Sequence, residues 1–207
     1  MELSVSILNA QDKMSMIKLL NNTEISYIHL DVMDGDFVMQ KSLPLEEIKE
    51  LAKISEKKLD IHLMVSNPLE YIIELENISK IEYITIHLEI NKNIKEILKK
   101  IKSYGYKTGV SIKPNTDINK LLPYINDLDL ILLMTVEPGL GGQKFIESSS
   151  SRLKELRKLV GDKIKIEVDG GINNITIKEV AETDIAVVGS YITKNENPVE
   201  KINDLLV

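Results

Sequence analysis

The 207-residue sequence has no cysteine and no tryptophan, and it has only three histidines. Without cysteine, the chain can form no disulfide, no thiolate nucleophile and no cysteine-based zinc site. A bound metal ion must therefore be held by histidine, aspartate or glutamate side chains. Because there are so few histidines, each one can be considered individually.

The chain also lacks an excess of basic residues and any long apolar run. Its 26 lysines and arginines are outnumbered by 32 aspartates and glutamates, which gives a formal net charge of -6. Nucleic-acid-binding domains usually carry a basic surface, and a membrane-spanning helix needs about 20 consecutive apolar residues. We therefore expect neither nucleic acid nor a membrane as a partner. The N-terminus does not have the pattern of a signal peptide, so we expect a cytoplasmic location.

Short β-branched segments alternate along the chain with longer amphipathic segments. Strands are predicted to begin near positions 3, 26, 58, 83, 106, 128, 163 and 184. Helical patterns cover 45–54, 68–78, 94–104, 150–160 and 197–205. Eight β-then-α units with no linker between them predict the α/β class, as a single-domain (β/α)8 TIM barrel over 1–207 that forms the catalytic domain.

The main alternative to a barrel is a doubly wound open sheet. Such a sheet carries a glycine-rich phosphate loop after its first strand, but the segment 9–12 contains no glycine. The glycines instead gather late in the sequence, between positions 139 and 189. Barrels commonly bind phosphate in the loops after their last strands, so the glycine distribution favours the barrel.

Polar side chains occur at the C-terminal ends of the predicted strands, where the active sites of barrels form. In the second strand, alternation places His29, Asp31 and Met33 on one face. His62 ends the third strand and Asp169 ends the seventh. A single histidine is more often a hydrogen-bonded core residue than a ligand. The convergence of two imidazoles and two carboxylates favours a divalent metal site with positions open for substrate oxygens.

Asp31 and Asp169 lie on strands two and seven, so a barrel can place them across its mouth from each other. Two carboxylates on opposite sides of a substrate can remove a proton from one face and return it to the other. A metal ion can stabilise the intermediate enediolate as a Lewis acid. This pair predicts inversion of a carbon next to a carbonyl.

Three glycine-containing segments, 136–145, 169–171 and 189–190, follow the sixth, seventh and eighth strands. Small residues allow backbone N–H groups to surround an anion, and a helix N-terminus can help to bind phosphate. Each segment alone could be a tight turn. Three in succession at the same end of the barrel predict a phosphorylated ligand.

Several motifs follow one another along nearly the whole chain: Ser6-Ile7-Leu8-Asn9, His29–Gly35, His62–Val65, His87-Leu88-Glu89, Ile112–Thr116, Met134–Phe145, Val168–Gly171 and Gly189-Ser190. This series resembles the ribulose-phosphate 3-epimerase family. The resemblance implies a (β/α)8 barrel, and an isomerase that interconverts D-ribulose 5-phosphate and D-xylulose 5-phosphate in the pentose phosphate pathway. It also implies a phosphorylated ketose substrate and a homo-oligomer, either a dimer or a hexamer.

The resemblance further implies a role for particular residues. One divalent metal ion (zinc favoured over iron(II), manganese or cobalt) is held by His29, Asp31, His62 and Asp169, and the two aspartates exchange the C3 proton. The implied substrate-binding residues are Ser6, His62, Gly139, Leu140, Gly141, Gly142, Asp169, Gly170, Gly171, Gly189 and Ser190. Met33, Met64 and Met134 are expected to line the pocket, the alternative being ordinary core filling.

Two segments depart from the family pattern. Val5 stands where the family usually has proline, and Phe37–Pro44 lacks the usual proline and asparagine and looks shortened. The segment Asp36–Pro44 could cover the site, so its departure bears on closure, rate and substrate preference. His87 is predicted to be a hydrogen-bonded neighbour of the site, and Glu89 and Asp34 are predicted to orient or cap other groups.

Three alternative functions stay open. One is 3-epimerisation of a hexulose phosphate such as allulose 6-phosphate on the same scaffold. The second is a Schiff-base aldolase with Lys113, near the end of the fifth strand, as nucleophile. The third is a sugar-phosphate-binding barrel without catalytic activity.

Overall fold

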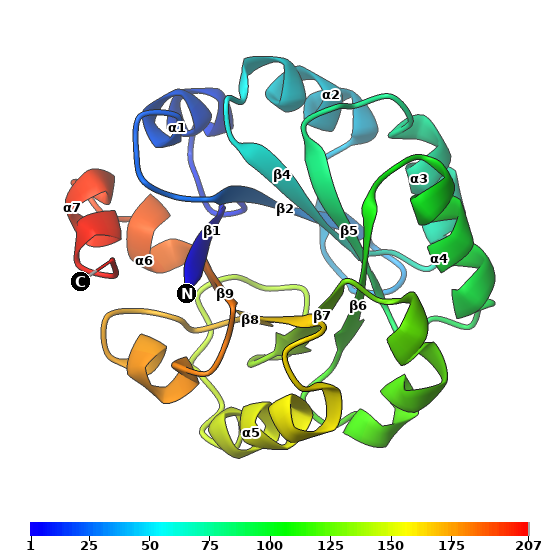
Figure 1. Ribbon diagram of the computed structural model, residues 1–207. Coiled ribbons are helices and arrows are strands. Elements are labelled where there is room, and N and C mark those ends of the chain that lie inside the picture. Colours follow the sequence, from blue (N-terminus) through cyan, green and yellow to red (C-terminus); the bar gives the residue numbers. More distant parts are fainter. Residues whose placement is uncertain (207) are drawn as a thin grey trace.

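A closed barrel of parallel strands forms the centre of the computed structural model, which describes residues 1–206 (Figure 1). The strands follow the order β1-β9-β8-β7-β6-β5-β4-β2, and the pairing of β1 with β2 closes the barrel. Their bounds are β1 Glu2–Ser6, β2 Tyr27–Asp34, β4 Lys58–Met64, β5 Ile81–His87, β6 Lys107–Ile112, β7 Leu130–Met134, β8 Lys165–Asp169 and β9 Ile185–Val188. The predicted (β/α)8 architecture is confirmed, and each strand begins within about two residues of its predicted start.

Helices surround the barrel because their apolar faces pack against the outer surface of the strands (Figure 1). Their bounds are α1 Lys13–Leu20, α2 Leu45–Ile54, α3 Pro68–Glu74, α4 Ile94–Ser103, α5 Ser149–Val160, α6 Ser190–Thr193 and α7 Pro198–Asn203, with 3₁₀ helices η1 Ile118–Asp127 and η2 Thr176–Val180. The helix expected over 68–78 ends early, at Glu74. Asn77 has a φ of 70°, a left-handed conformation that stops a right-handed helix and that asparagine tolerates.

Strand alternation sorts the side chains into two sets. Ile28, Leu30 and Val32 point outward and are fully buried beneath the helices. The side chains between them point into the barrel, in register with those of the next strand: His29 beside Asp60, Asp31 beside His62, and Met33 beside Met64. The apolar set holds the barrel and its helices together, whereas the inward set brings polar groups to the mouth.

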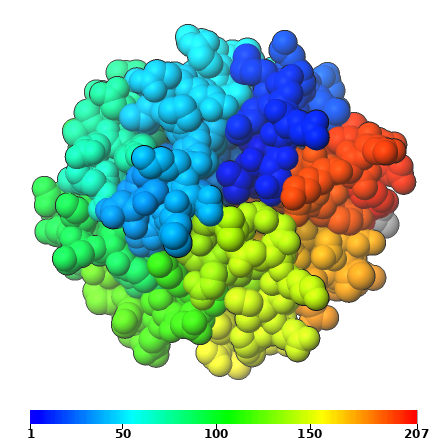
Figure 2. Space-filling view, turned by 180° about the vertical axis from the view of Figure 1, so that it is seen from behind, coloured from blue at the N-terminus to red at the C-terminus, as the bar shows by residue number. Residues whose placement is uncertain are grey.

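The loop after β2 contains a short strand, β3 (Lys41–Ser42), that the sequence pattern did not predict. It pairs antiparallel with β2, Ser42 opposite Met33 and Lys41 opposite Asp34. The loop therefore folds back along the end of β2, and Val38 lies close to Gly139 at the edge of the mouth. Figure 2 looks onto this end of the molecule, and the loop (light blue, near residue 40) lies beside the yellow-green segment that follows β7. Among residues 1–206, no helix has both the length and the apolar character to cross a membrane.

Candidate active site

A cavity of about 900 Å³ opens at the C-terminal ends of the strands. Its walls include Asp31, Asp169 and every residue expected to bind substrate or line the pocket, apart from His62. His62 is fully buried and lies beneath the floor of the cavity, as does His29. The structure thus brings together, in one cavity, residues that lie more than 180 positions apart in the sequence.

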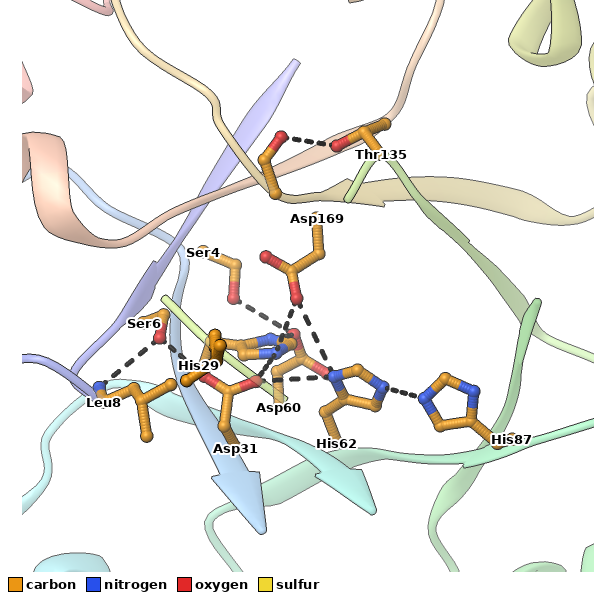
Figure 3. Close-up of polar contacts among 12 residues, drawn as sticks. Ser4, Ser6, Leu8, His29, Asp31, Asp60, His62, His87, Thr135 and Asp169 are labelled. Atoms are coloured by element: carbon orange, nitrogen blue, oxygen red, sulfur yellow. Dashed lines mark hydrogen bonds and ion pairs between the residues drawn. The ribbon is translucent and has the colours of Figure 1, made fainter. Parts of the chain in front are cut away.

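The four candidate metal ligands converge at the floor of this cavity (Figure 3). One ligand atom from each of His29, Asp31, His62 and Asp169 can be chosen so that all four atoms lie within 4.8 Å of one another. Oδ1 of Asp31 lies 3.4 Å from both His29 Nε2 and His62 Nδ1. Oδ2 of Asp169 lies 3.9 Å and 3.8 Å from the same two nitrogens. The predicted convergence of these side chains is present.

Two buried nitrogens of this set fit a metal site because they have no other partner. His29 Nε2 and His62 Nδ1 are inaccessible to solvent and have no hydrogen-bond partner within residues 1–206. Ligands about 2.1 Å from a central zinc ion in tetrahedral geometry lie about 3.4 Å apart, which is close to the separations from the Asp31 oxygen. The group of two imidazoles and two carboxylates could therefore hold a divalent metal ion.

Each of these two histidines has a different partner on its other nitrogen. His29 Nδ1 lies 2.6 Å from Asp60 Oδ2, and His62 Nε2 lies 2.9 Å from His87 Nε2. His87 is outside the four-residue set and contacts Glu89 through Nδ1 at 3.2 Å. The prediction that His87 is a hydrogen-bonded neighbour of the site is therefore confirmed.

Glu89 anchors the His62–His87 pair to the loop after β6. One of its carboxylate oxygens accepts hydrogen bonds from the backbone N–H of Lys113, at 2.8 Å, and from the hydroxyl of Thr116. Although burial favours its neutral form, these donors and the His87 ring lower the pKa of Glu89 to about 2. The predicted orienting role of Glu89 agrees with this geometry.

Asp34 caps the turn that follows β2. Its carboxylate accepts hydrogen bonds from the backbone N–H groups of Asp36, Phe37 and Ser66 at 2.6–2.9 Å, as predicted for a capping group. The Phe37 ring then packs 4.7 Å from the His87 ring. The loop that departs from the family pattern is therefore tied to the neighbourhood of the site at its base.

The pKa values of the two site aspartates are shifted in opposite directions. Burial and the nearby Asp31 carboxylate raise the pKa of Asp169 to about 6. Burial also acts to raise the pKa of Asp31, but the His29 and His62 rings outweigh it and hold that pKa well below its usual range. Two like groups at one site are thus held in different protonation equilibria, as is common where protons are transferred.

The loops after β7 and β8 pack so closely that glycine is required. Gly171 has a φ of 69°, and a Cβ atom there would lie 2.4 Å from the backbone nitrogen of Phe145. At Gly170, φ is 121° and a Cβ atom would lie 2.3 Å from Val136. The predicted glycine segments therefore adjoin in space, and their backbones border the cavity.

Sequence reasoning missed two groups of residues near the site. Lys194 lines the cavity, and its Nζ lies 3.8 Å from where a Cβ atom of Gly142 would be. Its position four residues after Ser190, about one helical turn, was the available signal. The second group, Ser4, Asp60 and Glu167, lies deeper in the barrel, each two residues before a predicted site residue on the same strand face.

Lys113 does not line the cavity that holds the candidate site. Its Nζ lies 4.3 Å from the centroid of the Phe37 ring, a cation–π contact. A Schiff-base nucleophile must reach the bound carbonyl, so the position of Lys113 disfavours the aldolase hypothesis.

Comparison with known proteins identifies one family of relatives. The model of the Ribulose-phosphate 3 epimerase family matches residues 2–193. The chain is 37% identical over 185 residues to the cytoplasmic isoform of ribulose-phosphate 3-epimerase from Oryza sativa subsp. japonica, covering 86% of this chain and 80% of that protein. It is 34% identical over 203 residues to ribulose-phosphate 3-epimerase from Helicobacter pylori, covering 95% and 93%.

Solved structures of lower identity share the fold. A mutant tryptophan synthase alpha-subunit from Pyrococcus furiosus superposes with a TM-score of 0.76 at 17% identity, covering 99% of this chain and 97% of that one. The 3-hexulose-6-phosphate synthase from Salmonella typhimurium gives 0.72 at 19% identity, covering 99% and 96%. These two likenesses concern the barrel alone.

Proposed function

The chain belongs to the ribulose-phosphate 3-epimerase family, and we propose that Asp31 and Asp169 carry out its reaction from opposite sides of the bound sugar phosphate. The protein is an epimerase, and so an isomerase, that interconverts D-ribulose 5-phosphate and D-xylulose 5-phosphate by inverting C3. One observation carries the proposal. Both carboxylates line the cavity and approach the same pair of buried histidine nitrogens.

In the proposed reaction, one aspartate accepts the C3 proton and the other donates a proton to the opposite face of the same carbon. The bond to the departing hydrogen leaves its electron pair on the substrate, where the C2 carbonyl oxygen takes up the charge. Protonation from the other side then restores the ketone with inverted configuration. Ser6 assists by holding one oxygen of Asp31 through a 2.6 Å hydrogen bond.

The four residues His29, Asp31, His62 and Asp169 would hold one divalent metal ion, for which we favour zinc. When bound, this ion supplies Lewis-acid stabilisation of the negative charge that develops on the sugar oxygens. The protein residues have separate tasks. The buried histidines present Nε2 of His29 and Nδ1 of His62 to the carboxylates, and the side chains of Met33, Met64 and Met134 give the cavity an apolar wall.

The substrate phosphate is assigned to the glycine side of the cavity. Backbone amides of Gly139–Gly142, Gly170–Gly171 and Gly189–Ser190 border this space, and the Ser190 hydroxyl and Lys194 ammonium group lie beside it. This arrangement accounts for binding of an anion by a chain whose net charge is -6. The backbone amides and Lys194 are donors within the cavity itself, so binding of the phosphate depends on this local arrangement and not on the net charge of the whole chain.

The test of this function is solvent exchange at C3. Ribulose 5-phosphate incubated with the protein and zinc in D₂O should acquire deuterium at C3, and xylulose 5-phosphate should form. No deuterium at C3 of ribulose 5-phosphate, with metal supplied, would contradict the proposed reaction. If allulose 6-phosphate also failed to exchange, the alternative of hexulose epimerisation would be contradicted as well. That double failure would favour the non-catalytic barrel.

A six-carbon substrate is kept as the second candidate because of one feature. The loop 36–44, which borders the mouth, differs from the family pattern and contains the pairing of β3 with β2. Comparison of kcat/KM for ribulose 5-phosphate and allulose 6-phosphate distinguishes the two, and we expect the pentulose to be preferred. Borohydride treatment with substrate should give no adduct on Lys113.

Two further features belong to the proposal. We expect a homo-oligomer, which light scattering of the purified protein would measure, and elemental analysis would identify the metal. We also propose a cytoplasmic location, the one printed in the name of the Oryza sativa relative.

A further inference from the structure

The geometry points to Asp60 as a positioning residue that holds His29 with its Nε2 atom facing the metal-ligand set. The Ser4 hydroxyl donates to Asp60, and Glu167 lies in the same buried layer. This inference rests on the proposed metal site and deepens it. None of the three residues reaches the cavity that takes the substrate. Their effect on the reaction is therefore exerted through His29.

The contact between His29 and Asp60 is short and fully enclosed. His29 Nδ1 lies 2.6 Å from Asp60 Oδ2, and the Ser4 hydroxyl donates to the same oxygen at 3.1 Å (Figure 3). His29 and Ser4 have no solvent exposure and Asp60 has 1%. Rotation of the imidazole would break this contact with no water available to replace it, so the ring orientation is fixed.

Because Nδ1 of His29 is occupied by Asp60, only Nε2 is available as a metal ligand. His29 Nε2 then points toward the carboxylates of Asp31 and Asp169. In metal sites, a ligating histidine almost always donates its other N–H to a carboxylate, carbonyl or water, which sets ring orientation and raises ligand basicity. The Asp60–His29 pair has this arrangement.

In His62, the roles of the two ring nitrogens are reversed relative to His29. Nε2 of His62 faces His87, so Nδ1 is the nitrogen that points to the carboxylates. The partner of His29 is a carboxylate, and the partner of His62 is an imidazole that only then contacts Glu89. The structure therefore assigns Nε2 of His29 and Nδ1 of His62 as donor atoms, and makes His29 the ligand with the more strongly polarising partner.

Glu167 gives an independent reason to assign a function to this layer. It is fully buried, and neither of its carboxylate oxygens has a hydrogen-bond partner within residues 1–206. One of its oxygens lies in a group with atoms of His29 and Asp60 that are all within 4.8 Å of one another. Barrel interiors are usually filled by branched apolar side chains, and buried carboxyl groups are costly. A contribution to stability does not explain why two buried carboxyl groups, those of Asp60 and Glu167, lie directly beneath the ligand set.

The test compares zinc affinity and imidazole NMR in two variants and a matched control. Asp60→Ala removes the acceptor, whereas Asp60→Asn keeps an oxygen that can accept from Nδ1–H but removes the charge. Thr85→Val is the control, because Thr85 is equally buried and its hydroxyl has no partner within residues 1–206. Competition with a chromophoric chelator should show affinity about 10- to 100-fold weaker for Asp60→Ala, a smaller loss for Asp60→Asn, and no change for Thr85→Val.

The NMR measurement is independent of activity and of affinity. With three histidines in the chain, the zinc-loaded protein gives three imidazole signal sets. The wild-type protein should show His29 protonated at Nδ1 and bound through Nε2, and Asp60→Ala should lose this unique state. Binding through Nδ1 of His29 in the wild type, or wild-type affinity in Asp60→Ala, would overturn the inference.

The remaining outcomes are also decisive. If Asp60→Ala does not fold, the affinities of Asp60→Asn and Glu167→Gln take its place, and equal affinity to wild type in both would overturn the inference. A wild-type protein that epimerises without binding metal would overturn it and leave the proposed function standing. A protein that binds zinc with the predicted Asp60 dependence but exchanges no C3 proton would instead remove the proposed function and keep this inference.

Discussion

The hydroxyl of Ser6 donates a 2.6 Å hydrogen bond to Oδ2 of Asp31, while Oδ1 of the same carboxylate faces the two unpartnered histidine nitrogens. Ser6 thus holds one oxygen of the carboxylate and leaves the other facing the ligand set. Ser6 comes from β1 and Asp31 from β2, and the parallel pairing of these strands is what closes the barrel. Closure of the fold and placement of a proton-transferring group depend on the same pair of strands.

Replacement of Ser6 by alanine should therefore lower turnover. A hydrogen bond to a charged group contributes about 1.5–3 kcal/mol, so kcat for C3 epimerisation should fall about 10- to 100-fold. The change removes one oxygen atom from a small side chain, and the thermal unfolding midpoint should change little. Steady-state kinetics measure the effect, and an unchanged kcat would show that Asp31 does not need this contact.

Asp31→Asn and Asp169→Asn should each nearly abolish epimerisation. Loss of a positioned acid or base typically costs about 10²–10⁴-fold, and an amide cannot accept and return a proton. Both variants should keep the circular dichroism spectrum of the folded barrel. Deuterium incorporation at C3 from D₂O is the measurement, and normal turnover by either variant would refute the two-aspartate mechanism.

Removal of metal should lower both activity and stability. A ligand present at about 100 times its Kd stabilises the folded state by about 2.7 kcal/mol, which corresponds to roughly 5–10 °C in the unfolding midpoint of a chain of this size. Dialysis against a chelator should lower the midpoint by this amount, and added zinc should restore it. His62→Gln should show a much smaller zinc-dependent shift, and a full shift in that variant would place the ion elsewhere.

Glu89 should make stability depend on pH. Its pKa is about 2 in the folded protein and 4.5 ordinarily. A depressed folded-state pKa contributes stability that is present above about pH 4.5 and is lost as the pH falls toward 2. About a fifth of the side chain is exposed, so the contribution at neutral pH is on the order of 2 kcal/mol.

Urea unfolding of the wild type and Glu89→Gln measures this contribution. The difference in free energy of unfolding between them should be largest near pH 6 and should shrink as the pH falls to 3. Glu196→Gln, at an exposed position, is the control. A difference that does not change with pH would show that Glu89 acts through its shape and hydrogen bonds alone.

Lys194→Met should weaken substrate binding and spare the chemistry. Loss of one charge-assisted contact to the phosphate should raise KM roughly tenfold with kcat nearly unchanged, because the phosphate is bound equally in the ground and transition states. Lys154→Met on α5, an exposed position away from the cavity, should change neither constant. Equal KM values for Lys194→Met and wild type would remove Lys194 from the phosphate site.

The repeating pattern of the sequence made the barrel predictable. Alternation along β2 and β4 assigns His29, Asp31 and His62 to one side of the sheet. The same rule applied to Asp60, two positions before His62, but a carboxylate below the end of a strand did not suggest a site residue. The structure of the segment 36–44 could not be predicted in the same way, because β3 forms through two residue pairings with β2 and has no periodicity of its own.

The sequence by itself determined the barrel, the strand faces and the types of ligand available, because these depend on local alternation and composition. Only the tertiary structure decided which nitrogen of each histidine faces the site, since that depends on Asp60 and His87 from other strands. It also decided that Lys113 lies against Phe37 while Lys194 borders the cavity. These outcomes depend on contacts between distant segments, which exist only once the barrel has closed.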